Sequence, residues 1–266
     1  MLRAFLSRAA RHAELKLAPP FDAAEIRAIL LDIEGTTTPI DFVFKALFPF
    51  ATAHAEDFLR YHVQHPDVAE LIEQLHRAYR DDAAKGAPVW ADATNEEKTA
   101  SASGYVHWLI ARDSKITALK TLQGKIWEEG FRSGELKGEV YPDVAPALAR
   151  WKAQGRRIAI FSSGSVLAQK LLFANSTSGD LSSFVDGYFD TKTGSKREAE
   201  SYTKIAGSIG LQPRAILFVS DVGEELDAAE AAGIKTAHSL RPGISALENL
   251  RHREIRNFDE ILQSQQ

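Results

Sequence analysis

Two carboxylates and the turn that follows them make residues 29–40, ILLDIEGTTTPI, a candidate for chemistry. Three bulky apolar residues precede Asp32, a pattern typical of a strand buried on both faces of a parallel sheet. Glu34 follows on the same side of an extended backbone, and Gly35 lets the chain turn directly afterwards. Such a turn often has only a structural role, in which the aspartate side chain forms a hydrogen bond with its own backbone. If the segment is a functional site, it predicts two carboxylates at the end of the strand with threonine hydroxyls around them.

Polar residues also follow two later apolar runs. Residues 157–161 lead into Ser162, and residues 215–220 lead into Asp221. The carboxyl ends of parallel strands meet at one edge of a sheet, and ligands bind just beyond that edge. We therefore expect Asp32, Ser162 and Asp221 to converge on one site.

The turn of Ser162, Ser163 and Gly164 precedes a helical run over residues 166–173. Such a turn offers hydroxyls, free backbone amides and the positive end of the helix dipole to an anion. An ordinary serine cap of the helix would explain the same residues.

A basic and an acidic segment complete the set of candidate groups. Lys196 lies in the polar loop TKTGSKREAE, where Lys192 or Arg197 could serve as well. Asp221 opens an acidic cluster that needs either solvent or a cation. Magnesium takes such oxygen ligands while keeping waters and a substrate phosphate, whereas a solvated helix start would also favour acids. The cluster continues with Glu224, Glu225 and Asp227.

Together these groups predict phosphoryl transfer. An aspartate nucleophile can form an aspartyl-phosphate, and a second carboxylate can protonate the leaving oxygen. Magnesium, a lysine and hydroxyl donors can neutralise the transferring group.

The elements that must position these groups alternate between strand and helix, which predicts an α/β fold with a Rossmann-like parallel sheet flanked by helices. The expected strands after the first cover residues 157–161, 184–190, 215–220 and 234–237, and the expected helices cover residues 144–154, 166–173 and 198–209.

A helical insertion splits this core. Apolar residues recur at spacings of three and four over residues 43–61, 68–79 and 103–131, and the polar patch at residues 81–99 divides the block. We assign residues 28–41 and 137–266 to the α/β catalytic core, 42–136 to a helical cap and 1–27 to an N-terminal extension. The basic, amphipathic pattern of the first 20 residues resembles a transit peptide, but a frayed helix or an upstream start codon would explain it too. The polar end of the tail is expected to be disordered.

The composition excludes several classes of function. The 266-residue chain is 44% hydrophobic with a formal charge of -4, so it has no basic excess for nucleic acid or an anionic membrane. It has no cysteine, which excludes disulfides, thiolate nucleophiles and sulfur-ligated metals. No stretch approaches the roughly 20 apolar residues of a membrane span. We expect a soluble, cytoplasmic protein.

Five segments resemble the enolase-phosphatases, or acireductone synthases, of the haloacid dehalogenase superfamily. They are DIEGTTTPI, TALKTLQGKIW, IFSSGSVLAQKLLF, FDTKTGSKREAESY and ILFVSDV. The resemblance covers residues 29–242. It is specific because a glutamate in place of the superfamily's usual second aspartate, the SSGS turn and the cap sequence TALKTLQG occur together. Residues 1–27 and the tail lie outside it.

This resemblance implies a bifunctional, magnesium-dependent enzyme of methionine salvage. Its substrate would be 2,3-diketo-5-methylthiopentyl-1-phosphate, which is enolised and then dephosphorylated to the acireductone, with one magnesium ion per chain. Asp32 would be nucleophile and magnesium ligand, Glu34 a magnesium-site residue and acid/base candidate, and Asp221 the remaining carboxylate ligand.

The resemblance also implies how the phosphate is held. Ser162 and Ser163 would bind the phosphate, and Lys196 would hold the phosphate and the nucleophile together. A monomer is implied by the resemblance alone.

The enolisation base stays open between Glu34 and a group from the cap. His54 and His107 lie in the insertion, but a histidine on a helix is more often packed or solvated than catalytic. The insertion itself is expected to close over the substrate as a lid.

Four further cap residues lie in or beside the recognisable cap segment. Trp127 is expected in the core, and Gln123 is either a polar contact or a surface residue. The other two are Lys115 and Lys120.

Two other functions remain as alternatives. The first is a phosphatase of the same superfamily that acts on another small phosphate ester, because the motifs determine the phosphoryl chemistry but not the leaving group. The second is a non-catalytic phosphate-binding protein, against which the intact nucleophile argues.

Overall fold

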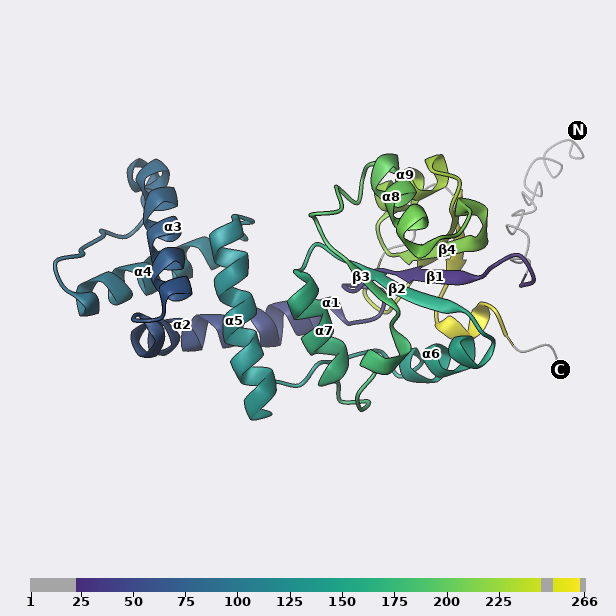
Figure 1. The fold of residues 1–266 in the computed structure, drawn as a ribbon, viewed down its shortest axis with the longest axis horizontal. Helices are drawn as coiled ribbons and strands as arrows, with labels where there is room; N and C mark the ends of the chain where they lie inside the picture. The colour runs from purple at the N-terminus through teal and green to yellow at the C-terminus, as the bar shows by residue number, and fades with distance from the viewer. Residues whose placement is uncertain (1–22, 245–250, 264–266) are drawn as a thin grey trace, which may run out of the picture.

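Residues 23–244 and 251–263 are described by the structure, a computed structural model (Figure 1). The transit-peptide-like segment and the last three residues of the polar tail lie outside the described residues. The exact division of the chain into extension, core and cap stays a prediction.

A six-stranded parallel sheet lies at the centre of the fold, with the strand order β3-β2-β1-β4-β5-β6. In this doubly wound order the strand sequence reverses between β1 and β4, and ligands of such sheets bind at the reversal. The predicted Rossmann-like α/β class is confirmed. The strands are β1 (Ala28–Leu31), β2 (Arg157–Phe161), β3 (Gly187–Phe189), β4 (Ile216–Ser220), β5 (Lys235–Ser239) and β6 (Arg253–Ile255).

Strand β1 is the central strand and is buried along its whole length. Its alternating side chains contact two different apolar clusters, Ile29 and Leu31 on one face of the sheet and Ala28 and Leu30 on the other. Leu31 pairs in register with residues of both β2 and β4, so the residues that follow these three strands start at the same sheet edge.

Two helices cover each face of the sheet. The helices α6 (Val144–Ala153) and α7 (Val166–Ala174) pack on one face, where Trp151 is fully buried. The helices α8 (Ala199–Ile209) and α9 (Gly223–Ala231) pack on the other. The sheet is therefore shielded on both faces and open to ligands only at its edges.

The helical insertion has a separate apolar core. Its helices are α1 (Ile40–Phe42), α2 (Phe48–His62), α3 (Pro66–Asp82), α4 (Asn95–Ile110) and α5 (Thr117–Ser133), with a π-helical turn over Val43–Leu47. Leu59, Leu75, Val106 and Leu122 bring α2 to α5 together in that core. Figure 1 shows these helices at one end of the molecule, with α5 lying beside α7 of the sheet domain.

Two expected elements differ in the structure, and one strand was not expected. The predicted helical stretch over residues 103–131 is wrong as one helix, because the chain breaks between α4 and α5, where Asp113 adopts a φ of 50°. Helix α4 starts inside the predicted polar patch, because Thr94 and Glu97 form a reciprocal capping box there. Strand β6 was not predicted, because three residues are too short for a period-two pattern.

Gly138 offers a test of how tightly the chain returns from the cap to the core. A Cβ at this glycine would lie 2.3 Å from the backbone oxygen of Leu172 in α7, so the backbone must shift. We expect Gly138→Ala to lower the free energy of unfolding by about 1–3 kcal/mol. The matched control is Gly207→Ala on the exposed side of α8, where a Cβ meets nothing within 4 Å. That change should raise stability by about 0.5–1 kcal/mol. Thermal unfolding of both variants checks this, and equal midpoints would contradict it.

Candidate active site

Asp32 lies directly after β1 and is almost completely buried. Its Oδ1 accepts hydrogen bonds from the Ile33 amide at 2.7 Å and from the Lys196 ammonium at 2.6 Å. Its Oδ2 accepts one from the Ser220 hydroxyl at 3.2 Å. These donors hold the carboxylate in one orientation at the reversal of the strand order.

Lys196 is the basic residue of its loop that reaches the site. Its ammonium lies 2.6 Å from both Asp32 and Glu225, whereas Lys192 and Arg197 are exposed. Burial alone would lower the pKa of Lys196, but the two carboxylates outweigh it and raise that pKa above its ordinary value. The hydroxyl of Tyr202 donates to the Lys196 carbonyl at 2.7 Å and so positions the loop.

Glu34 is half-buried and faces the serine turn, where the Ser162 hydroxyl donates to its Oε2 at 3.4 Å. Burial, followed by the Asp32 charge, raises the pKa of Glu34. The next residue, Gly35, has a φ of 71°, and a Cβ there would lie 2.2 Å from the Asp221 carboxylate. A glycine is needed at this position because the turn packs directly on Asp221.

The serine turn is held open toward the sheet edge. Ser165 caps α7 by accepting from the Ala168 amide at 3.2 Å, so Ser162 and Ser163 are not the helix cap. The Gln169 side chain donates to the carbonyls of Gly164 and of Phe189, each at 2.8 Å. Ser162 is buried and Ser163 is exposed to the cavity described below. The turn is available to an anion.

The acidic cluster after β4 divides between the site and the surface. Asp221 and Glu225 face the site, whereas Glu224 and Asp227 are exposed. Glu225 was not among the predicted site residues, although it pairs with Lys196 and accepts from the Ser220 hydroxyl at 2.9 Å. The dense acidic run pointed to this region, but only the turn at the start of α9 decides which acid faces inward.

The buried carboxylates suit a divalent cation. Burial, reinforced by the charge of Asp32, raises the pKa of both Asp221 and Glu225 to about 7. Asp32, Glu34 and these two acids outnumber the Lys196 ammonium, so a further positive charge would stabilise their ionised forms. All of these donors are oxygens, as magnesium prefers.

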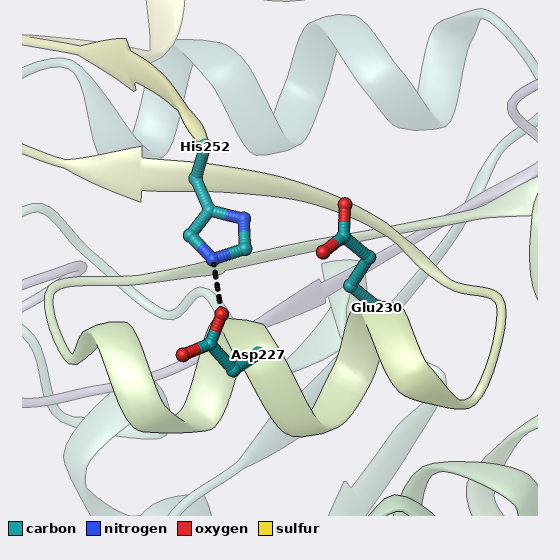
Figure 2. A group of neighbouring side chains, drawn as sticks. All are labelled: Asp227, Glu230 and His252. Carbon is teal, nitrogen blue, oxygen red and sulfur yellow. Dashed lines mark hydrogen bonds and ion pairs between the residues drawn. The ribbon is translucent and has the colours of Figure 1, made fainter. Parts of the chain in front are cut away.

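A different acidic group lies on the far side of β5. Among the described residues, Asp227, Glu230 and His252 are the His, Asp or Glu side chains that come within 4.8 Å of one another as a group of three (Figure 2). The Arg251 guanidinium already neutralises this group, because it pairs with Asp227 at 3.1 Å and with Glu230 at 2.6 Å.

The side-chain oxygens of the predicted ligands Asp32, Glu34 and Asp221 do not come together as such a group of three. Magnesium is usually bound through one or two carboxylates, with waters and substrate oxygens in the rest of its shell, so not all three acids need to bind the ion directly.

A cavity of about 410 Å³ lies above these groups, between the sheet edge and the cap. Its core wall includes the carboxylates, Lys196 and the serine turn, and its cap wall is mostly apolar. The four cap residues singled out in the sequence, Lys115, Lys120, Gln123 and Trp127, all line it.

The two cap histidines singled out in the sequence bind backbone oxygens of their own domain. His54 Nδ1 lies 2.9 Å from the Phe50 carbonyl oxygen, and His107 Nε2 lies 2.9 Å from that of Thr52. Neither lines the cavity.

The fold and these strand-end groups define a hydrolase of the haloacid dehalogenase-like class, and the model of that family matches residues 26–233. More narrowly, the chain belongs to the enolase-phosphatase E1 family. It is 52% identical over 236 residues to the enolase-phosphatase E1 of Synechococcus elongatus, covering 89% of this chain and 98% of that protein. Identity to the Pseudomonas syringae pv. tomato protein of the same name is 48%, over 89% and 97% of the two chains.

Solved structures show the same fold. The UTR4 protein of Saccharomyces cerevisiae has a TM-score of 0.71 and 35% identity, covering 89% of this chain and all of that one. CbbY of Rhodobacter sphaeroides, solved in complex with phosphate, shares only the fold, with a TM-score of 0.54 and 16% identity over 88% and 95% of the chains. Among the described residues, no helix has the length and apolar character needed to cross a membrane.

Glu225 can be tested against its neighbour. Glu225→Gln keeps the shape of the side chain but removes one of the two charges that hold Lys196, and we expect phosphatase turnover to fall roughly 10- to 100-fold. Glu224→Gln, one residue away and exposed, should change it by less than about twofold. Steady-state phosphate release measures both. Full activity in Glu225→Gln would show that Lys196 does not depend on this contact.

Proposed function

We propose that this chain carries out the enolase-phosphatase reaction of its family, the conversion of 2,3-diketo-5-methylthiopentyl-1-phosphate to the acireductone and phosphate. The observation that carries the proposal is the buried Asp32–Lys196 pair at the floor of a cavity that the cap encloses. A protein that only bound phosphate would have no need of a held and buried nucleophile.

Asp32 is the proposed nucleophile. Its carboxylate attacks the phosphorus and the ester P–O bond breaks, so an aspartyl-phosphate forms while the substrate oxygen leaves and takes up a proton. Water then attacks the aspartyl-phosphate, which releases phosphate and regenerates the carboxylate. Lys196 orients the carboxylate through its hydrogen bond and supplies positive charge beside the transferring group. Ser162 and Ser163 are the proposed phosphate donors, through the turn that Gln169 keeps open.

Glu34 is the proposed proton-transfer group of the core. It lies beside the phosphate turn, where C1 of the substrate would sit, and its raised pKa suits a group that takes a proton and returns it. The Glu34 carboxylate has one more methylene than the aspartate usual at this position, which extends its reach.

Magnesium, one ion per chain, would be held by Asp32, Glu34 and Asp221, and when bound it would offset the charge of the phosphate. A monomer, implied by the family resemblance, stays a prediction. A cytoplasmic location, implied by the family, stays a prediction.

Asp32→Asn tests the nucleophile. The amide fills the same space but cannot attack phosphorus, so we expect p-nitrophenyl phosphate hydrolysis to fall by at least about 1,000-fold. The control Asp41→Asn changes an exposed aspartate nine residues further along the chain and should retain activity. Equal rates for wild type and Asp32→Asn would remove Asp32 from this role.

The diketo phosphate tests the complete reaction. With magnesium present, ultraviolet absorbance of the enol should rise before phosphate appears, because enolisation comes before dephosphorylation. Phosphate release with no enol signal would point to an ordinary phosphatase. No turnover of this substrate, with p-nitrophenyl phosphate still hydrolysed, would point to another small phosphate ester.

A further inference from the structure

Gln123 is a buried polar side chain with nothing to bind. It lies on α5, is 5% exposed and lines the cavity. Within the described residues its side-chain amide makes no hydrogen bond. The amide is open to the cavity, so a molecule bound there could supply its hydrogen-bond partner.

A second glutamine that lines the same cavity, Gln169 on α7, differs from Gln123 in its hydrogen bonds. Gln169 is 1% exposed, and its amide nitrogen binds two backbone carbonyls, each at 2.8 Å. Gln169 therefore has a structural role that accounts for its burial. Gln123 has no comparable role.

Helix α5 places Gln123 opposite the phosphate turn. Lys120, one turn earlier on the same helix, reaches across the cavity to within 3.4 Å of the Ser163 carbonyl oxygen. At the next residue, Gly124, a Cβ would lie only 3.7 Å from the Ser165 hydroxyl, so the helix and the turn are close neighbours. A substrate phosphate in the turn would place the following carbons against this face of α5.

We propose that Gln123 recognises the dicarbonyl part of the substrate, donating from its amide nitrogen to a ketone oxygen. This inference rests on the proposed function. Adjacent ketones offer only acceptors, and the side-chain amide of glutamine carries two donor hydrogens. Enolisation builds negative charge on the ketone oxygen, so a donor held there stabilises the transition state as well as the bound substrate.

Gln123→Met is the sharpest test, because methionine has a similar shape and no donor. We expect kcat/KM for the diketo phosphate to fall by about 100-fold, with the enol absorbance delayed in proportion. The fall for p-nitrophenyl phosphate, which has no ketone, should be at least about tenfold smaller. The midpoint of thermal unfolding should change little, because the Gln123 amide makes no hydrogen bond within the described residues and methionine fills a similar volume.

The control is Gln74→Met on the exposed side of the cap helix α3. This change should alter neither kcat/KM for the diketo phosphate nor the hydrolysis of p-nitrophenyl phosphate. Equal losses for both substrates, or a lowered unfolding midpoint, would show that Gln123 is structural and overturn the inference. Unchanged diketo phosphate turnover would also overturn it. If the wild-type protein itself failed to enolise the diketo phosphate, the proposed function would fall first, and this inference with it.

Discussion

The buried ammonium of Lys196, held between Asp32 and Glu225 at 2.6 Å from each, is the interaction on which the site depends. Two carboxylates this deeply buried would repel each other without a positive charge between them. The lysine comes from a loop far along the chain, and β1 and α9 bring the two acids to it. Each part of the α/β core therefore contributes to one charge arrangement.

The same edge of the sheet also holds the junction with the cap. Arg241 is buried, donates to the Thr36 carbonyl at 3.0 Å and pairs with Asp143 at 2.9 Å. The Tyr141 amide donates to the Thr37 carbonyl at 2.9 Å, and the Arg241 guanidinium lies 4.4 Å from the Tyr141 ring. The segment that leaves the core after the nucleophile and the one that returns to it are thus bound to each other.

Placement of the cap above the core explains how one site can serve two reactions. The phosphoryl chemistry needs charged groups, which lie at the sheet edge, whereas a donor to the ketone oxygens would lie further along the substrate, toward the cap. The cavity has this division, with charged groups on the core wall and Gln123 and Lys120 on a largely apolar cap wall.

The sequence by itself determined the class of fold and the predicted set of strand-end groups, because apolar runs that stop at Asp32 and Asp221 are local patterns with a period and a boundary. It also determined the family, through motifs that are contiguous in the chain. Tertiary structure decided the rest. Glu225 rather than Glu224 faces Lys196 because of the angle at which α9 starts, and the break between α4 and α5 interrupts an apolar periodicity that continues across it. Whether Gln123 was a contact or a surface residue depended on how α5 packs against α7, and no local pattern encodes a packing between segments so far apart.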